Sequence, residues 1–226
     1  MNALKVTLLK VSIKLRIFFL ENLLRPLRPP HMVRLGTYYG GWWIPDDVTP
    51  PGTALCVGAG TDVTFDLELA RLGFHVVTAD PTPDSVAYLE QYRDVLEVRP
   101  VGVWTSTGEI EFAQDSTFAE SWMIGGTATA SVGTTGSQSF PVMTVKDLIA
   151  DAGLDGAPLD ILKLDIEGAE HDVLRSMLAD GILPRCLCVE FDDHRIRRVI
   201  ASTRLLQRAG YTLLQIEGLN YIFTRA

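Results

Sequence analysis

A stretch in the second half of the chain changes from the pattern of a strand to the pattern of a helix at a single glycine. Residues 159–164 are mostly apolar, as in a buried strand, and the apolar residues of 169–178 recur at nearly helical spacing. Gly168 lies between the two patterns, and Gly181 and Pro184 mark the end of the helix. The stretch therefore predicts a buried strand that leads directly into a helix, as in an α/β sheet.

Acidic residues gather at this change of pattern. Asp165 directly follows the strand, Glu167 lies in the turn, and Glu170 and Asp172 fall in the first turn of the helix. Because the helix dipole favours negative charge there, we interpret Glu170 and Asp172 mainly as residues that start the helix. Open α/β sheets bind their ligands at the carboxyl ends of the strands. Asp165 and Glu167 are therefore candidate catalytic residues.

A βαβ unit earlier in the chain predicts a nucleoside site. Residues 54–57 form an apolar strand, a turn and a helix follow, and a second strand ends at Asp80. Gly58 and Gly60 allow the backbone to approach a ligand at a helix N-terminus, and Asp80, twenty residues beyond Gly60, is placed to hold ribose hydroxyls. Val63 replaces the third glycine of a dinucleotide fingerprint, which disfavours NAD. The candidate cofactor-binding residues are Gly58, Ala59, Gly60, Asp62 and Asp80.

The rest of the chain continues the alternation of strands and helices. A single strand is expected near residues 96–104. Residues 186–191 form another apolar strand, which Asp192 and Asp193 follow. Residues 211–216 and 220–224 predict a closing antiparallel pair around a Glu-Gly turn. The expected fold is a mostly parallel α/β sheet, whose switch point brings the nucleoside site next to the acidic strand ends.

The residues Lys163-Leu-Asp-Ile-Glu-Gly-Ala-Glu170 resemble the hallmark of the FkbM-type methyltransferases. The resemblance covers about residues 54–214. Its other pieces are Val57-Gly-Ala59, Asp80-Pro81, Gly108-Glu-Ile-Glu-Phe112 and Met143-Thr-Val-Lys-Asp-Leu148. It implies a class I, S-adenosylmethionine-dependent enzyme with a Rossmann-like sandwich over residues 36–226: a mostly parallel seven-stranded sheet with a C-terminal antiparallel hairpin and helices on both faces. It also implies O-methylation of a hydroxyl on a small molecule, a sugar or a lipid.

The sequence departs from the family pattern at two positions. The family usually has an acid two residues before the first glycine and an asparagine after Gly-Ala, and here these positions are Cys56 and Gly60. The family's acid helps to position the methionine end of the cofactor. Asp62 is an alternative acid for that role, and loss of the cofactor site is the other interpretation.

Transfer of a methyl group to a hydroxyl requires removal of the hydroxyl proton, by a general base or a metal. His194 and His171 titrate near neutral pH, and we take His194 as the stronger candidate base. Asp165, Asp192 and Asp193 resemble the magnesium site of catechol-type O-methyltransferases. Helix capping, and pairing of Asp165 with Lys163, explain the same acids, so we assign no metal ligand.

The charge of the chain is uneven. The 226 residues carry a net charge of −8, which argues against a nucleic-acid partner. Residues 1–35 contain seven basic residues and one acid, or +6, which leaves −14 for the remainder. Cys56, Cys186 and Cys188 lie in apolar strands, which indicates buried thiols in a reducing compartment, the cytoplasm.

Three segments lie outside these motifs. Residues 1–35 predict a basic amphipathic helix and a Pro-rich linker; the helix either lies peripherally on the inner membrane surface or packs on the domain or on a second subunit, as in a homodimer. Residues 36–51 are rich in aromatic residues and glycine, and either cover a ligand mouth or plug the sheet. Residues 116–139 are rich in Ser, Thr and Gly, and form either a substrate lid or a plain loop.

Two other functions compete with methyl transfer. A NAD-dependent oxidoreductase would also use a βαβ unit and would be protected by NAD instead of S-adenosylhomocysteine. A non-catalytic protein of the membrane surface, with a degenerate cofactor site, would bind liposomes through residues 1–28 without binding S-adenosylmethionine.

Overall fold

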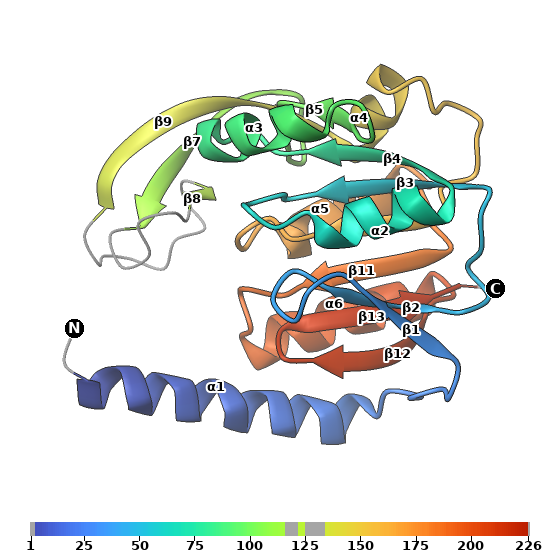
Figure 1. Ribbon diagram of the computed structural model, residues 1–226. Coiled ribbons are helices and arrows are strands. Elements are labelled where there is room, and N and C mark those ends of the chain that lie inside the picture. Colours follow the sequence, from blue (N-terminus) through green and yellow to red (C-terminus); the bar gives the residue numbers. More distant parts are fainter. Residues whose placement is uncertain (1–2, 116–121, 125–133, 226) are drawn as a thin grey trace.

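The computed structural model describes residues 3–115, 122–124 and 134–225, and the side chains of residues 13–111 and 138–225. Its centre is a seven-stranded sheet in the order β12-β13-β11-β10-β3-β4-β5 (Figure 1). The strands are β3 (Gly52–Val57), β4 (Phe74–Ala79), β5 (Glu97–Arg99), β10 (Ile161–Leu164), β11 (Cys186–Glu190), β12 (Thr212–Glu217) and β13 (Asn220–Thr224). Six of the seven strands run in the same direction, and β13 runs antiparallel to both of its neighbours, as predicted.

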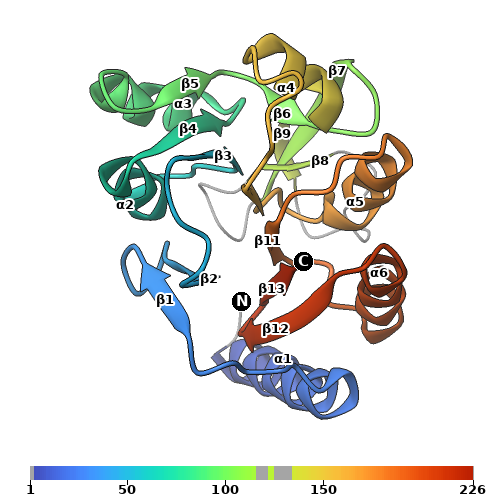
Figure 2. The ribbon, with the colours of Figure 1, turned by 90° about the vertical axis from the view of Figure 1, so that its right-hand side faces the viewer.

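Helices cover both faces of this sheet (Figure 2). They are α2 (Thr64–Leu72), α3 (Pro83–Leu89), a 3-10 turn (Glu90–Tyr92), α4 (Val145–Asp151), α5 (Glu170–Ala179) and α6 (Ile196–Arg208). Leu55 and Val57 of β3 join the core cluster under α4, α5 and α6, whereas Ala54 and Cys56 join the cluster under α2. This alternation is the pleat of a strand buried on both faces, and it explains why the strand is almost continuously apolar. The Rossmann-like α/β sandwich is confirmed.

A hairpin of β1 (Met32–Leu35) and β2 (Trp42–Pro45) adds to the α2 face. Trp42 is buried, whereas Tyr38 and Tyr39 at the hairpin tip are 96% and 90% exposed. The aromatic segment therefore has features of both predicted arrangements: Trp42 is buried against the sheet, and the exposed Tyr39 at the tip lines a cavity.

A second sheet has the order β6-β9-β7-β8. Its strands are β6 (Gly102–Val103), β7 (Gly108–Asp115), β8 (Trp122–Ile124) and β9 (Thr134–Met143). The single strand that the sequence suggests near residues 96–104 is wrong, because it divides into β5 and β6, which belong to different sheets. Much of the predicted lid, residues 116–121 and 125–133, lies outside the described residues, and the rest contributes to β8 and β9.

The N-terminal segment forms the helix α1 (Ala3–Leu24), which lies along the β12 edge of the sheet (Figure 1). Leu20 is fully buried against the domain. The backbone amides of Leu27 and Arg28 donate to the carbonyls of Leu213 and Leu214, at 3.0 and 2.7 Å, so the segment after α1 pairs with the exposed edge strand. Among the described helices, none is long and apolar enough to cross a bilayer.

Candidate functional site

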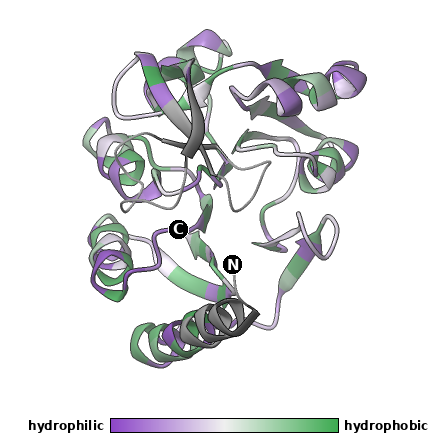
Figure 3. Ribbon diagram, turned by 90° about the vertical axis from the view of Figure 1, so that its left-hand side faces the viewer, coloured by the Kyte–Doolittle hydropathy of each residue, from purple (hydrophilic) through white to green (hydrophobic). Residues whose placement is uncertain are grey.

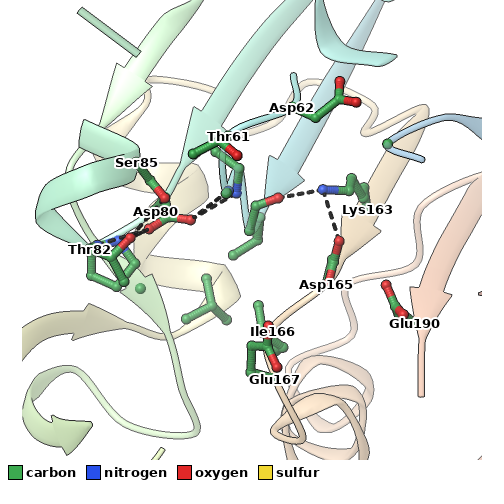
Figure 4. A pocket seen from close by; sticks show the side chains of 18 of the residues that line it. Thr61, Asp62, Asp80, Thr82, Ser85, Lys163, Asp165, Ile166, Glu167 and Glu190 are labelled. Carbon is green, nitrogen blue, oxygen red and sulfur yellow. Dashed lines mark hydrogen bonds and ion pairs between the residues drawn. The ribbon is translucent and has the colours of Figure 1, made fainter. Parts of the chain in front are cut away.

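A cavity of about 660 Å³ opens where β3, β4, β10 and β11 end (Figure 4). One side is the glycine loop that follows β3, together with Asp80 after β4. The other side is formed by Asp165 and Glu167 after β10, and by Glu190 and Asp192 at the end of β11. The structure thus brings the predicted nucleoside site and the predicted acidic strand ends into one cavity.

The glycine loop has two glycines with different tasks. Gly58 has φ +86°, and a Cβ there would lie 1.7 Å from the carbonyl oxygen of Asp165, so only glycine lets the loop pass this close to β10. Gly60 has φ +50°, but a Cβ there would meet no atom within 4 Å. Gly58 therefore joins the two halves of the site, whereas Gly60 faces open space that a ligand can fill.

Asp80 holds the glycine loop in place. Its Oδ2 accepts the amides of Ala59 and Gly60 at 2.9 and 3.2 Å, and its Oδ1 accepts the amide and hydroxyl of Thr82 at 2.8 and 2.6 Å. Four donors fill the acceptor positions of a carboxylate. A ribose hydroxyl could therefore bind Asp80 only by replacing one of them. The Thr82 hydroxyl is the replaceable donor, because it also lies 2.8 Å from the hydroxyl of Ser85.

Asp62 also lines the cavity, but its carboxylate is already bound. It accepts the Thr37 hydroxyl at 2.5 Å and the Thr64 amide and hydroxyl at 3.0 and 2.6 Å. Burial alone would raise the pKa of Asp62, but these hydrogen bonds outweigh it and lower the pKa. Asp62 thus ties the tip of the β1–β2 hairpin to the start of α2.

The first departure from the family pattern does not leave a gap in the cavity. Cys56 is fully buried in the core under α2, beside the buried carboxyl of Asp66. Asp66 accepts the Thr78 hydroxyl at 2.8 Å. An acid therefore stays close to this position in space, although it is supplied by α2 and not by β3.

Lys163 puts a buried positive charge between the two halves. Its Nζ donates to the carbonyl of Gly58 and lies 3.5 Å from Asp165 Oδ2 and 5.9 Å from the Trp42 ring centroid. Burial alone would lower the pKa of Lys163, but the negative charges of Asp165 and Asp66 outweigh it and raise the pKa to about 12. The predicted pairing of Asp165 with Lys163 is confirmed.

Glu170 holds the turn that carries Asp165 and Glu167, through hydrogen bonds with the backbone of the turn. Glu170 is completely buried, and its Oε1 accepts the amides of Gly168 and Ile166 at 2.8 and 3.3 Å. Burial raises the pKa of Glu170 to about 8. Glu167 has φ +53°, a left-handed conformation that costs a non-glycine residue about 1 kcal/mol or more. Glu170 is therefore structural, as interpreted, but it supports the turn and not an exposed helix start.

Two further carboxyls complete the acidic side, and neither was singled out from the sequence as a catalytic candidate. Burial, followed by the negative charge of Asp165 and a hydrogen bond with it, raises the pKa of Glu190 to about 8. Burial, followed by the charges of Glu170 and Glu190, raises the pKa of Asp192 to about 10. Figure 4 shows Glu190 beside Asp165. These groups hold protons at neutral pH and can exchange them.

The histidines do not join the site. His194 is not among the residues that line the cavity, and its Nδ1 lies 2.8 Å from the carbonyl of Asp192, so the choice of His194 as base is not supported by its position. His171 is buried, stacks on Phe191 at 4.7 Å and contacts the Ser202 hydroxyl at 2.8 Å. Both rings thus contact other groups of the protein, and neither lines the cavity.

The magnesium alternative lacks its third ligand. Asp193 is bound by Arg195 and Arg198 at 2.6 Å each, and their charges outweigh burial and lower its pKa. Within the described parts of the chain, no group of three His, Cys, Asp or Glu side chains is arranged to hold a metal ion. Asp165, Asp192 and Asp193 therefore do not fit the magnesium site that was considered as an alternative from the sequence.

Comparisons with known proteins found solved structures of methyltransferases at low sequence identity. No curated protein matches the sequence. The METTL16 methyltransferase domain is similar at 11% identity over 96% of this chain and 68% of that chain, with a TM-score of 0.44. A TehB-like SAM-dependent methyltransferase from Corynebacterium glutamicum is similar at 13% identity over 80% and 84% of the two chains, with a TM-score of 0.39. The N-terminal domain of human METTL16 in complex with SAH is similar at 12% identity over 76% of this chain and 60% of that chain, with a TM-score of 0.37.

A family model, in contrast to these distant structures, matches most of the sequence. The profile of the methyltransferase FkbM domain matches residues 57–213, most of the chain, and it includes the glycine loop, Asp80, Asp165 and Glu190. The chain therefore belongs to the FkbM methyltransferase family.

Proposed function

We propose that this methyltransferase transfers a methyl group from S-adenosylmethionine to a hydroxyl of a small-molecule, sugar or lipid-linked acceptor. The observation that carries the proposal is the single cavity that joins the glycine loop and Asp80 to the carboxyls of Asp165 and Glu190. A nucleoside site and a proton-accepting site within one cavity are what transfer to a hydroxyl requires.

The glycine-loop side has the features that S-adenosylmethionine needs. The open space at Gly60 and the replaceable hydrogen bond of Asp80 suit the nucleoside, with the ribose hydroxyls taking the place of Thr82. Lys163 keeps its positive charge and would attract the carboxylate at the methionine end. When bound, the cofactor supplies an electrophilic methyl group on a positively charged sulfur. The proposed binding site therefore does not depend on an acid at the position of Cys56.

The acidic side would take the proton. Glu190 is hydrogen-bonded to Asp165, and its pKa is raised to about 8, so the proton of Glu190 leaves at mildly alkaline pH. A base with a pKa near the working pH is the most effective one. Asp165 is the more exposed of the two, since its side chain is 32% exposed, and it is the group that would meet the acceptor hydroxyl.

The charge of the cavity also restricts the acceptor. The wall formed by Asp165, Glu167, Glu190 and Asp192 consists of carboxyls, and its neighbouring cation, Lys163, is already paired with Asp165, so a phosphate or carboxylate acceptor would find no free positive charge there. A neutral hydroxyl can donate to these oxygens and needs no compensating charge. A sugar or another polyol could use several of them at once.

Binding and turnover test the proposal separately. Calorimetry with S-adenosylhomocysteine measures the cofactor site, and methyl transfer to a panel of sugars, phenols and polyprenyl-linked sugars measures the reaction. We expect S-adenosylhomocysteine to bind and NAD not to bind. Absence of S-adenosylhomocysteine binding would refute the cofactor assignment, and methylation of amines or carboxylates alone would refute the hydroxyl acceptor.

A further inference from the structure

The helix α1 carries an uncovered apolar stripe. Leu15, Phe18, Phe19 and Leu23 expose 64%, 66%, 50% and 48% of their surface. Residues three, four and eight positions apart lie on one side of a helix, so these side chains form one row. Leu27, which is 65% exposed, extends the row beyond the end of the helix. A row of large apolar side chains in water marks an interaction surface.

The opposite side of α1 is fixed to the domain. Leu20 is fully buried, and Ile17 and Leu24 pack against the same core cluster. Glu21 pairs with Arg28 at 3.3 Å, and the following backbone is hydrogen-bonded to β12. The helix therefore has apolar side chains on both faces, which departs from the expected pattern of one apolar and one basic face. These contacts fix the side of α1 that faces the solvent, and Figure 3 shows α1 at one edge of the molecule.

Positive charge accompanies the row. Lys14 and Arg25 are exposed next to it, and the side chain of Arg28 is 62% exposed. Residues 1–35 carry +6, against −14 for the rest of the chain. The acidic body would be repelled by a negatively charged surface, so the basic helix decides which side of the molecule approaches it.

A second copy of the chain fits this surface less well. In a two-fold contact of α1 with α1, the basic residues of one helix would face those of the other. An anionic bilayer instead offers hydrocarbon to the apolar row and lipid headgroups to Lys14 and Arg25.

We infer that α1 lies in the surface of an anionic membrane, with Leu15, Phe18, Phe19 and Leu23 inserted between the headgroups. Figure 1 shows that the N-terminal end of α1 points to the side on which β3 and β11 end, the side of the cavity. A membrane at α1 would thus hold the cavity close to an acceptor that is anchored in lipid. The inference rests on α1 alone, so it stands or fails independently of methyl transfer.

Vesicle flotation with the full chain tests the inference. We expect binding to phosphatidylcholine vesicles that contain phosphatidylserine, weaker binding to phosphatidylcholine alone, and loss of binding in high salt. The double variant Phe18→Ser/Phe19→Ser should weaken binding about tenfold or more, because the inserted rings supply the apolar burial. Lys14→Glu should weaken binding to the anionic vesicles and leave the weak binding to phosphatidylcholine unchanged.

A matched control is the double variant Leu72→Ser/Val95→Ser, which removes side chains that are 51% and 56% exposed elsewhere on the domain. It should bind vesicles like the wild type. Circular dichroism and S-adenosylhomocysteine affinity verify that each variant is folded. Absence of vesicle binding, or equal losses in the two double variants, would overturn the inference. So would light scattering that shows a dimer which Phe18→Ser/Phe19→Ser dissociates, because the row would then bind a second copy.

Discussion

The two halves of the cavity use the same residue type in opposite ways. In the glycine-loop half, the Asp80 carboxylate accepts four hydrogen bonds from the protein, and hydrogen bonds lower the pKa of Asp62. In the acidic half, burial and neighbouring carboxyls raise the pKa of Glu190 to about 8 and that of Asp192 to about 10. In one half, hydrogen bonds from the protein occupy the acceptor positions of the carboxylates. In the other half, the buried carboxyls have raised pKa values.

The difference separates binding from chemistry. A carboxylate that is surrounded by backbone amides is permanently charged and rigid, and so it preorganises a binding loop. Burial and mutual repulsion raise the pKa of a carboxyl toward the pH at which an enzyme works, and such a group can exchange a proton with a substrate. Substitutions in the first half should therefore affect cofactor affinity, and substitutions in the second half should affect turnover.

Gly58→Ala should have the largest effect, because Gly58 is where the two halves touch. The new Cβ would overlap the Asp165 carbonyl, and the φ of +86° is unfavourable for alanine, so we expect a loss of about 3 kcal/mol or more in the free energy of unfolding and no S-adenosylhomocysteine binding. Gly60→Ala is the matched control: it has no overlap and should lose only about 1 kcal/mol. Urea unfolding and calorimetry measure both. Equal destabilisation by the two changes would contradict the close contact at Gly58.

Asp165→Asn should separate the halves most clearly. We expect kcat to fall about 100-fold or more, because the amide cannot accept the proton, while S-adenosylhomocysteine affinity stays within about threefold. Glu190→Gln should resemble it. Asp193→Asn changes a neighbouring acid that is bound by Arg195 and Arg198 outside the cavity, and it should leave kcat nearly unchanged. Full activity of Asp165→Asn would return that residue to a structural role, and a large loss in Asp193→Asn would revive the metal alternative.

Asp80→Ala should weaken cofactor binding without acting on the chemical step. Removal of the carboxylate leaves the amides of Ala59 and Gly60 without their acceptor, so we expect S-adenosylhomocysteine affinity to fall about 100-fold and stability by about 1–3 kcal/mol, with the fold intact. Asp84→Ala removes an exposed acid of the same cavity wall and should change affinity by less than about threefold. Unchanged affinity in Asp80→Ala would refute both the loop contact and the ribose assignment.

The smallest expected effect is in the pH dependence of stability. A carboxyl whose pKa rises from 4.5 to about 8 on folding binds a proton more tightly in the folded state. Its contribution to stability is complete below pH 4.5 and is lost as the pH rises toward 8. The wild-type protein should therefore lose free energy of unfolding between pH 5 and pH 8. In Glu190→Gln this loss should be smaller by about 1–3 kcal/mol. Urea unfolding at both pH values measures it. An undiminished loss in the variant would show that Glu190 does not hold the proton.

Much of the fold follows from local patterns. The apolar runs and the residues that end them determine the strands β3, β4, β10 and β11, because a fully buried strand must be apolar on both faces. The positions of Gly58, Asp80, Asp165 and Glu167 at the carboxyl ends follow from the same patterns, and all four line the cavity. The boundary between β5 and β6 could not be predicted, because it depends on which sheet each segment joins and not on its composition.

What the sequence determined by itself was the end of the sheet at which the reactive groups lie, since chain direction and strand order place every carboxyl end on one edge. Only the tertiary structure decided which groups face one another. It brought Glu190 to Asp165, put Lys163 between the halves, filled the acceptor positions of Asp80 and left His194 out of the cavity lining. These contacts join residues from strands far apart in the chain. Burial and the distances between charges, which set the pKa values, exist only once the strands are packed.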